Sequence, residues 1–430
     1  MAFGNFNCAK ACEVQRNEYW EIRYTIAAAH FCSVNLMEDG RLARPAGGGH
    51  PASTKCLKEA VLRNARLKPM ATFKAETISP RSAYAPDAKT SRENARVLER
   101  KTRPVFVMGC HRSGTNLLYD TLLSAGGFAV YRGYLPVYKM LLPRFGNLAE
   151  LTNRKRMMDA WVRSKGFRRS GLNAEQLAVK ILEECRSGGD FIRIVMGEIA
   201  RGQNVARWAI YDPDNLLYIP SIKADIPEAL FIHIIRDGRD VALSLSTMRG
   251  FKPLFWEREA KGLLPTALYW EWMVRAGRQG GNRFPADYIE VRYEELVSDP
   301  RAALGKLKQF LDHDLDYDRI QNATLGRLRE SNSSFPKAND QRSPVNRWRQ
   351  KLSRRELASI EAMVGTYLEE LGYPLSSLVR KSGLQEKFTR AFYFNLLTAK
   401  LWLKTRTPAG RLANLEALQL SDSIEPMEAE

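Results

Sequence analysis

Short apolar runs alternate with segments of helical periodicity along most of the chain, beginning at Pro104. Four runs have the length and composition of β-strands: residues 105–108, 207–211, 230–235 and 288–293. The third is continuous enough to predict a strand buried on both faces, and the first and fourth are predicted to be buried strands. Between and after the runs, apolar residues recur three or four positions apart, as on one face of a helix. This alternation predicts an α/β fold, a three-layer sandwich with a central parallel sheet.

Residues that start or stop helices refine this picture. Gly126 and Gly127 are predicted to end the helix after the first run, and a short strand is expected at residues 128–131. Ser353 is a predicted N-cap, and Gly372 a predicted stop, for a late helix. Helices are expected over residues 147–163, 174–185, 191–200, 216–222, 241–246, 266–278, 302–311 and 354–371, and a polar loop over residues 312–346.

The segment after the first run carries the strongest candidate chemistry. The strand is followed by Gly109, by the sequence CHRSGTN at residues 110–116, and then by leucines at helical spacing. Such a loop turns several backbone N–H groups toward one point at a helix N-terminus, which predicts a site for a phosphate-like anion. Gly109 and Gly114 permit the turn. Arg112 supplies a fixed cation, whereas the lysine of a Walker A loop is missing. The alternative interpretation is an ordinary strand–loop–helix connection.

A second strand-to-helix junction follows residues 230–235. The apolar run changes to RDGRD at residues 236–240, and a helix is expected immediately after it. Arg236 stands at the carboxyl end of a predicted parallel strand, where open α/β sheets bind ligands. Ser244 is expected to face the same anion from the first turns of the helix. The alternative is that Arg236 only forms an ion pair with Asp240.

The two ends of the chain differ from its middle. Residues 1–103 show no clear periodic core and are predicted to be a poorly ordered extension; we hypothesise that translation naturally starts at Met70. Residues 104–379 form the predicted α/β domain. Residues 380–411 mix aromatic side chains and leucines with lysine and arginine, which predicts a basic amphipathic helix, followed by an acidic end at residue 430. We expect this helix to dock on the domain, the alternative being a peripheral membrane contact.

Composition narrows the classes of protein. The length of 430 residues and the apolar content of 44% suit a globular protein with a large core. No run is long enough to span a membrane and the first residues lack the pattern of a secretory signal, so we expect a cytoplasmic protein. The net charge of +18 favours anionic partners, but no nucleic-acid-binding motif is present. Six irregularly spaced cysteines predict free thiols and no metal site.

Three motifs taken together resemble the sulfotransferase superfamily: strand–GCHRSGTN–helix, strand–RDGRDVALS–helix, and the later YEEL, RW and LGY sequences. The resemblance covers residues 104–373. It implies a P-loop-like architecture and transfer of a sulfuryl group from 3′-phosphoadenosine 5′-phosphosulfate (PAPS) to a hydroxyl acceptor, without a metal. In that family the first loop holds the 5′-phosphosulfate. By resemblance this role falls on Arg112, Ser113, Gly114, Thr115 and Asn116, with Arg112 also catalytic.

The same resemblance implies roles for residues later in the chain. Arg236 and Ser244 would hold the 3′-phosphate of the donor, and Tyr293 would pack near its adenine. The region 342–348 would fold over the 3′-phosphate, with Arg347 as a contact. The implied reaction is an in-line displacement at sulfur, in which preorganised N–H donors and a fixed arginine stabilise the developing charge.

Two positions depart from the pattern of that family. Relatives commonly carry a lysine immediately before an Asp/Thr-Pro step, where this chain has Tyr211. Many also carry a glutamate base shortly after the first helix, and the segment that ends at Tyr134 contains no acid. Asp212, Glu198 and His111 are the candidates to replace this base. The alternative functions are therefore a catalytically silent PAPS-fold binding protein and, less favoured because the Walker lysine and a magnesium-binding pattern are missing, a P-loop nucleotide kinase. Neither the acceptor nor the oligomeric state can be predicted.

Overall fold

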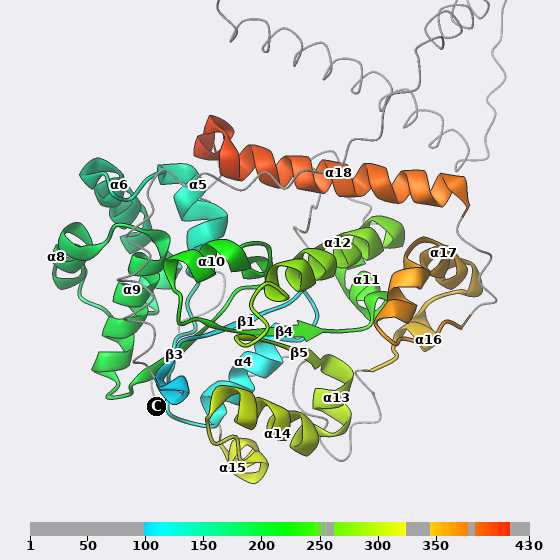
Figure 1. Ribbon diagram of the computed structural model, residues 1–430, viewed down its shortest axis with the longest axis horizontal. Helices are drawn as coiled ribbons and strands as arrows, with labels where there is room; N and C mark the ends of the chain where they lie inside the picture. The colour runs from blue at the N-terminus through cyan, green and yellow to red at the C-terminus, as the bar shows by residue number, and fades with distance from the viewer. Residues whose placement is uncertain are drawn as a thin grey trace, which may run out of the picture. The chain divides into compact units, whose positions relative to one another are not determined.

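The structure, a computed structural model, describes residues 99–248, 251, 254, 262–323, 345–376 and 383–412. In these residues a five-stranded sheet has the order β2-β3-β1-β4-β5, and all neighbouring strands run parallel. The strands are β1 (Val105–Met108), β2 (Phe128–Ala129), β3 (Arg207–Tyr211), β4 (Leu230–Ile235) and β5 (Tyr288–Arg292). The predicted α/β class with a central parallel sheet is confirmed (Figure 1).

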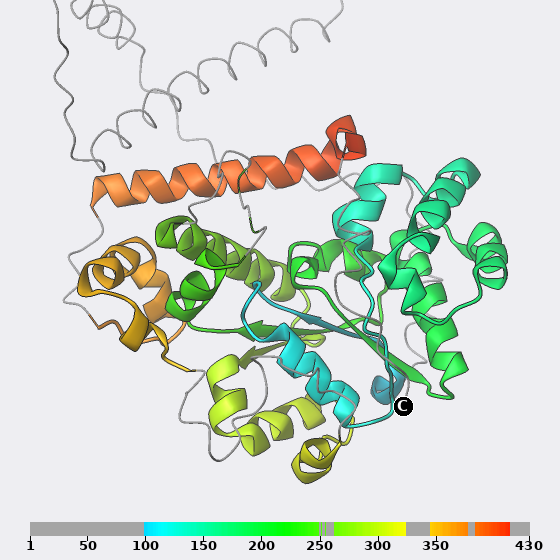
Figure 2. The ribbon, with the colours of Figure 1, turned by 180° about the vertical axis from the view of Figure 1, so that it is seen from behind.

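Helices lie on both faces of the sheet and complete the predicted three layers (Figure 1, Figure 2). One face is covered by α4 (Thr115–Ser124), α13 (Tyr293–Ser298), α14 (Pro300–Leu311) and α15 (Tyr317–Asn322). The other is covered by α9 (Gly188–Gly202), α10 (Ile219–Asp225), α11 (Gly238–Ser246), α12 (Leu263–Gly281), α17 (Arg354–Glu370) and α18 (Leu384–Arg406). The remaining helical segments are η1 (Arg100–Thr102), η2 (Val137–Leu141), α5 (Leu142–Phe145), α6 (Leu151–Val162), α7 (Lys165–Arg168), α8 (Ala174–Glu184), η3 (Pro213–Leu217), α16 (Trp348–Lys351) and η4 (Pro408–Leu412).

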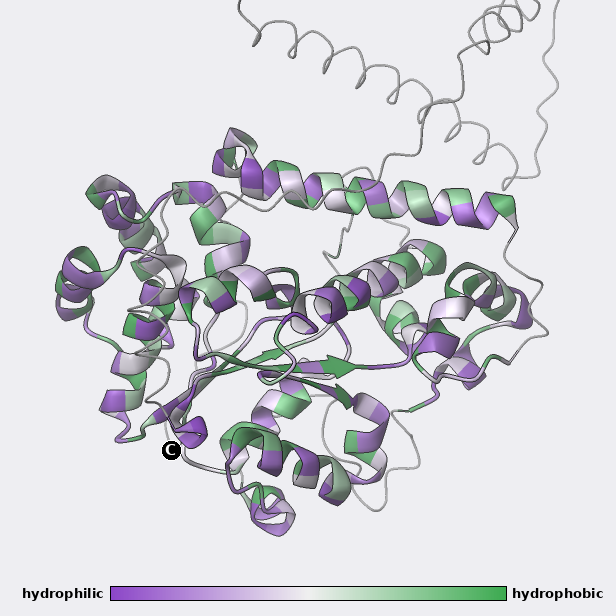
Figure 3. Cartoon of the chain, viewed as in Figure 1, coloured by the Kyte–Doolittle hydropathy of each residue, from purple (hydrophilic) through white to green (hydrophobic). Residues whose placement is uncertain are grey.

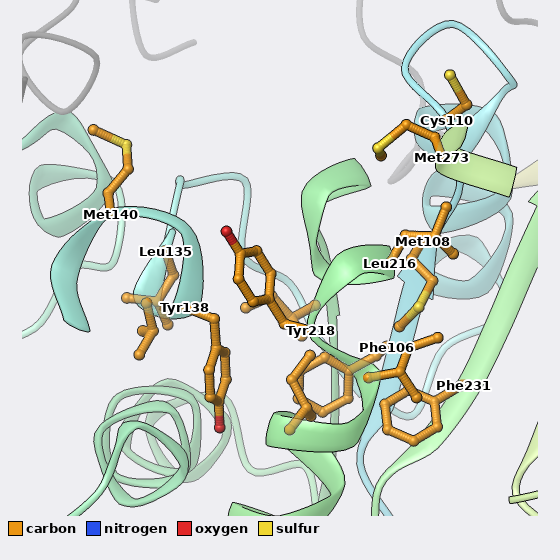
Figure 4. Close-up of a cluster of buried hydrophobic side chains, with 14 of the residues drawn as sticks. Phe106, Met108, Cys110, Leu135, Tyr138, Met140, Leu216, Tyr218, Phe231 and Met273 are labelled. Carbon is orange, nitrogen blue, oxygen red and sulfur yellow. The ribbon is translucent and has the colours of Figure 1, made fainter. Parts of the chain in front are cut away.

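Strand β1 shows why the central strands are continuously hydrophobic. Val105 and Val107 pack into the core on the α4 side, whereas Phe106 and Met108 pack into the core on the α12 side. All four side chains are fully buried. Figure 4 shows Phe106 and Met108 close to Phe231 of β4 in the second of these cores. A strand that is covered on both faces has no solvent-facing positions, so its sequence does not alternate.

The connections that leave the sheet beside β1 diverge to opposite faces. β1 leads to α4 on one face, whereas β3 leads to η3 and β4 leads to α11 on the other. The carboxyl ends of these strands are close together, because Val107 pairs with Tyr211 of β3 and Met108 pairs with His233 of β4. Divergent connections of this kind open a crevice at the carboxyl edge of a parallel sheet, where ligands bind.

Two sequence predictions for the strand and loop regions are wrong. β5 lies at the edge of the sheet, and of its five residues only Val291 is buried, so it is not a strand covered on both faces. It ends at Arg292, and Tyr293 begins α13. The predicted loop at residues 312–346 contains α15, whose N-cap Asp316 accepts a hydrogen bond from the backbone N–H of Arg319 at 2.7 Å. Residues 324–344 lie outside the described residues.

Several predicted helices have different limits in the structure. The predicted helix 191–200 begins earlier, at Gly188, because Ser187 and Asp190 form a capping box. The predicted helix 216–222 is divided at Tyr218 into η3 and α10, and α6 begins at Leu151 rather than at residue 147. Helix α17 is confirmed with its N-cap Ser353, which forms a capping box with Glu356.

The segment before Pro104 is bonded to the domain as far back as Arg100. Arg100 Nη2 donates to the carbonyl oxygen of Ala286 at 2.8 Å, and Arg103 Nη2 donates to Asp287 Oδ1 at 2.7 Å. The predictions for residues 1–98 and 413–430 lie outside the described residues. The domain limits at residues 103 and 379 stay predictions.

Helix α18 docks on the domain, as expected for residues 380–411. Arg390 Nε donates to Glu271 Oε2 of α12 at 2.9 Å, Trp272 Nε1 donates to Thr398 Oγ1 at 3.1 Å, and Leu397 is buried. Figure 3 shows hydrophobic and hydrophilic residues interspersed along its length. In the part of the chain that the structure describes, no helix is both long and apolar enough to cross a membrane.

Candidate functional site

The loop between β1 and α4 has the close approach and the strained backbone of a ligand-binding turn. A Cβ atom at Gly109 would overlap the backbone of Ile234, and one at Gly114 would overlap the ring of Tyr293. Gly114 also has φ of 99°, and Arg112 has φ of 70°. A positive φ in a non-glycine residue costs about 1 kcal/mol or more and is concentrated at functional sites. The predicted glycine requirement at the loop is thus explained by its neighbours and, at Gly114, by its backbone.

Arginines from three distant parts of the sequence meet at this loop. Arg112 Nε donates to Ser244 Oγ of α11 at 2.9 Å, and Arg236 Nη1 donates to the carbonyl oxygen of Arg112 at 3.2 Å. Partial desolvation, and then the charges of Arg236 and Arg347, lower the pKa of Arg112. We call Arg112, Arg236 and Arg347 the arginine cluster. Three cations that repel one another beside a helix N-terminus form a strong site for a multiply charged anion.

Arg236 forms the expected ion pair with Asp240 and also contacts the loop. Its Nη2 lies 3.4 Å from Asp240 Oδ2, so the ion pair exists. The same guanidinium contacts the loop and stacks on Tyr293, with its central carbon 4.3 Å from the ring centroid. Asp240 also accepts a hydrogen bond from the backbone N–H of Trp348 at 2.9 Å, which holds α16 and the adjacent Arg347 beside α11.

The site residues expected from the sequence lie along this one edge of the sheet. Ser113 and Thr115 are buried, and Asn116 is exposed in the first turn of α4. Ser113 Oγ has no hydrogen-bond partner among the described residues. An unsatisfied hydroxyl in an anion loop is an available donor for an oxyanion. The structure therefore brings together Arg112, Ser113, Gly114, Thr115, Asn116, Arg236, Ser244, Tyr293 and Arg347.

A buried network beneath the arginine cluster was not predicted. Arg239 is almost fully buried, donates to Asp237 Oδ2 at 2.7 Å and to Glu361 Oε1 at 2.6 Å, and lies 3.9 Å from the ring centroid of Trp348. Glu294 accepts from the backbone N–H of Asp237 at 2.8 Å. The RDG turn is thereby fixed from α13, α16 and α17. Because these partners are distant in sequence, only the repeated arginine in RDGRD hinted at this role.

A second polar cluster lies on the β3 side of the loop. His111 Nε2 is 3.2 Å from Asp214 Oδ2, and Lys139 Nζ of η2 bonds the same oxygen. Asp212 Oδ1 accepts from the backbone N–H of Asp214 at 3.0 Å. Lys404 of α18 is within electrostatic range of Lys139 and Asp214. We call His111, Lys139, Asp212, Asp214 and Lys404 the Asp214 cluster.

Burial and charge act differently on the two carboxylates of this cluster. Burial alone would raise the pKa of Asp214, but His111 and Lys139 together hold it well below its usual range. Burial, and then the negative charge of Asp214, raise the pKa of Asp212 to about 6. Asp212 Oδ2 has no hydrogen-bond partner among the described residues. Asp214 is therefore the fixed anion of the cluster.

The structure separates the three candidate bases and shows what Tyr211 does. Glu198 bonds Lys180 of α8 at 2.5 Å and also Arg201, near the end of α9 that leads into the amino end of β3. Glu198 therefore lies near the amino edge of the sheet, away from the loop, whereas His111 and Asp212 lie at the carboxyl edge, beside the loop.

The ring of Tyr211 packs on Tyr119, with centroids 4.6 Å apart, and supplies no cation.

Comparison with known proteins gives this site a family. The family model described as "Sulfotransferase family" matches residues 104–317, which include the loop, both strand-to-helix junctions and Tyr293. The chain contains a sulfotransferase-family domain. A putative protein-tyrosine sulfotransferase of Caenorhabditis briggsae is 24% identical over 284 residues, which cover 64% of this chain and 90% of that protein.

Solved sulfotransferase structures are similar at lower identity. The sulfotransferase domain of the Synechococcus PCC 7002 olefin synthase is 16% identical with a TM-score of 0.39, covering 64% of this chain and 96% of that one. Sulfotransferase STF9 from Mycobacterium avium is 13% identical with a TM-score of 0.35, covering 68% and 81%.

The residues of the site lie partly inside and partly outside the region that the family model matches. Arg112, Arg236 and the Asp212–Asp214 turn lie within residues 104–317. Arg347 and Lys404 lie beyond them, on α16's N-terminal side and on α18. Elements outside the matched region thus contribute a residue to each cluster. No group of three or more metal-ligating side chains occurs among the described residues.

Proposed function

We propose that this sulfotransferase transfers a sulfuryl group from PAPS to a hydroxyl acceptor. The observation that carries the proposal is the convergence of Arg112, Arg236 and Arg347 at the N-terminus of α4. PAPS is a polyanion with phosphate at two ends of one nucleoside, and it requires cations from more than one segment. A fixed guanidinium is well suited to each of its oxyanions.

The residues of the site fit the two anionic ends of the donor. Arg112 and the N–H groups of the loop would hold the 5′-phosphosulfate, where the unsatisfied Ser113 hydroxyl is also available. Arg236, Ser244 and Arg347 would hold the 3′-phosphate. The donor supplies the sulfuryl group and an adenosine 3′,5′-bisphosphate leaving group. The loop amides and Arg112 would stabilise the charge that develops as transfer proceeds.

The alternatives differ from this proposal in what the site would bind or do. A nucleotide kinase is disfavoured because Arg112 replaces the lysine of a Walker A loop and because no group of three or more metal-ligating side chains occurs in the described part of the chain. A silent PAPS-binding protein remains the second candidate, and Tyr211, whose partly buried ring packs on Tyr119 and supplies no cation, favours it. The Asp214 cluster favours an enzyme, because it places ionisable groups next to the loop.

We also propose a peripheral contact between α18 and an anionic membrane. Leu384, Phe388 and Trp402 lie on the outward face of the docked helix, and the two aromatic side chains are 53% and 52% exposed. Lys387 and Arg406 are exposed beside them. Aromatic and leucine side chains next to basic residues are typical of helices that lie in the membrane interface.

The donor proposal is tested by calorimetric titration with 3′-phosphoadenosine 5′-phosphate (PAP), beside ATP. Binding of PAP in preference to ATP is expected. Arg236→Ala should weaken it about 10- to 100-fold, since a charge-assisted hydrogen bond contributes about 1.5–3 kcal/mol. Arg301→Ala, which removes an exposed arginine paired with Asp318, is the matched control and should change nothing. A preference for ATP, or equal PAP affinity in Arg236→Ala, would contradict the proposal.

A further inference from the structure

The Asp214 cluster is not used by the donor site, yet it is built around the loop that forms that site. His111 immediately precedes Arg112 in the loop, Asp214 follows β3, and Lys139 comes from η2. These three segments come together because the carboxyl ends of β1 and β3 are paired at Val107 and Tyr211. The cluster therefore lies where an acceptor would approach a group held by the loop.

The geometry fixes one carboxylate and, through it, one imidazole. Asp214 is 7% exposed and is bonded by His111 Nε2 and by Lys139 Nζ on the same oxygen. Its backbone N–H is held in turn by Asp212. The imidazole of His111 retains partial exposure, with 23% of its side chain accessible, and its ring faces that of Phe251 at 6.4 Å. A side chain that is fixed on one side and accessible on the other can exchange a proton with a ligand.

We propose that His111 is the general base that accepts the proton of the acceptor hydroxyl, and that Asp214, held by Lys139, is its positioning residue. This inference rests on the proposed sulfuryl transfer. With Nε2–H donated to Asp214, the lone pair of Nδ1 takes the proton. The acceptor oxygen forms the new bond to sulfur, and the bond between sulfur and the bridging oxygen breaks with its electron pair going to the 5′-phosphate of PAP.

The titratable groups near Asp214 come from the elements packed around it. They are Cys110 and His111 of the loop, Tyr134 just before η2 and Lys139 within it, Asp212 and Tyr218 at the two ends of η3, Tyr269 of α12 and Lys404 of α18. Burial raises the pKa of the thiol and of the three phenols, so these groups are neutral at physiological pH. Lys139 and Lys404 are the cations, and Asp212 is the second carboxylate.

The Asp214 cluster offers a base in place of the glutamate that this chain lacks. Glutamate is missing near Tyr134, and Glu198 is at the far edge of the sheet, which leaves His111 and Asp212 as the candidate bases. Asp212 is only 2% exposed, compared with the accessible ring of His111. A base must reach the proton that it removes, so the more exposed side chain, His111, is the better candidate of the two.

The test compares three variants for transfer from PAPS to a panel of phenols and alcohols. In His111→Gln, the side-chain amide retains a donor to Asp214 but loses the base. We expect kcat to fall about 10²- to 10⁴-fold, with PAP affinity within twofold of wild type. Asp214→Asn should lower kcat about tenfold or more and leave the KM for PAPS unchanged, because the base loses the carboxylate that orients it while the donor site is intact. His313→Gln, whose imidazole bonds the carbonyl oxygen of Gly126, is the control and should behave as wild type.

The NMR chemical shifts of the His111 ring supply a readout that needs no acceptor, because they report the hydrogen bond between Nε2 and Asp214. These shifts should change in Asp214→Asn and stay unchanged in His313→Gln. Transfer that survives in His111→Gln, or ring shifts that are the same in Asp214→Asn and wild type, would overturn the base assignment alone. Absence of transfer by the wild type to every acceptor, with PAP still bound, would overturn the transfer proposal and this inference with it. Loss of PAP binding in His111→Gln would instead assign His111 to the donor site.

Discussion

The two clusters beside β1 differ in the balance of their charged groups. In the arginine cluster, Arg112, Arg236 and Arg347 approach one another, and Arg236 is paired with Asp240. In the Asp214 cluster, Lys139 and His111 are bonded to one carboxylate. Converging cations favour a bound anion, whereas a partly buried set of ionisable groups that are bonded to one another favours proton transfer. The difference indicates that one side of the loop holds the donor and the other handles the acceptor.

The clusters also differ in what supports them. The arginine cluster rests on the network of Arg239, Asp237 and Glu361, which ties α11 to α17. The Asp214 cluster is supported by shorter segments, η2 and η3, and by α18. The donor side is therefore expected to be the more rigid of the two, because fully satisfied buried networks fix a unique arrangement.

The largest effect should come from breaking this support. Arg239→Leu leaves Asp237 and Glu361 as buried carboxylates without their cation and should lower the free energy of unfolding by about 3–5 kcal/mol. Urea unfolding measures this loss. The matched control is Arg301→Leu, which breaks an exposed pair with Asp318 and should cost at most about 1 kcal/mol. A similar small loss in both variants would show that the donor side does not depend on this network.

The two clusters also differ in how far the sequence predicted them. Arg236 and the 110–116 loop could be located because each directly follows a continuous apolar run, and β1, β3 and β4 have the predicted limits. The partners of Asp214 could not, because Lys139 is 75 residues away in sequence and no periodic pattern connects them. His111 was a candidate base, but only the fold could rank it above Glu198. β5 was misjudged because it lies at the edge of the sheet, where all of its residues except Val291 stay at least partly exposed.

A second prediction concerns His233, a buried imidazole within the sheet. His233 of β4 is fully buried, its Nδ1 lies 2.6 Å from the hydroxyl of Tyr288, and burial, with a smaller effect of Arg278, lowers its pKa to about 3. Its contribution to stability is present above pH 6.5 and is lost as the pH falls toward 3, because the unfolded chain then binds a proton that the folded chain does not. At pH 5 the loss amounts to about 2 kcal/mol.

Unfolding at pH 7.5 and pH 5 compares wild type with His233→Gln. The wild type should lose about 2 kcal/mol more than the variant over this interval. If so, the activity at acidic pH can be measured in His233→Gln with less interference from acid unfolding. Equal losses in the two proteins would mean that His233 is not the buried neutral group that its surroundings indicate, and that acid lability arises elsewhere.

The smallest expected effect concerns α18, whose inward face carries paired charges and whose outward face exposes aromatic side chains. The inward face is paired, with Arg390 bonded to Glu271 and Lys404 near Asp214. The outward face exposes Phe388 and Trp402. Replacing both by serine should weaken binding to vesicles of phosphatidylcholine and phosphatidylserine about tenfold, because the two half-exposed aromatic rings together contribute about 1.4 kcal/mol of apolar burial.

Sedimentation with vesicles measures this change, and Val179→Ser, at a 55% exposed position on α8, is its matched control. The control should bind as wild type does, and both proteins should bind less at high salt, because exposed lysine and arginine are attracted to the anionic lipid. PAP affinity should be unchanged in the double variant, since only the outward face is altered. Equal vesicle binding by the double variant and the control would contradict the membrane contact. The role of α18 would then be limited to its contacts with the domain, including that of Lys404 with the Asp214 cluster.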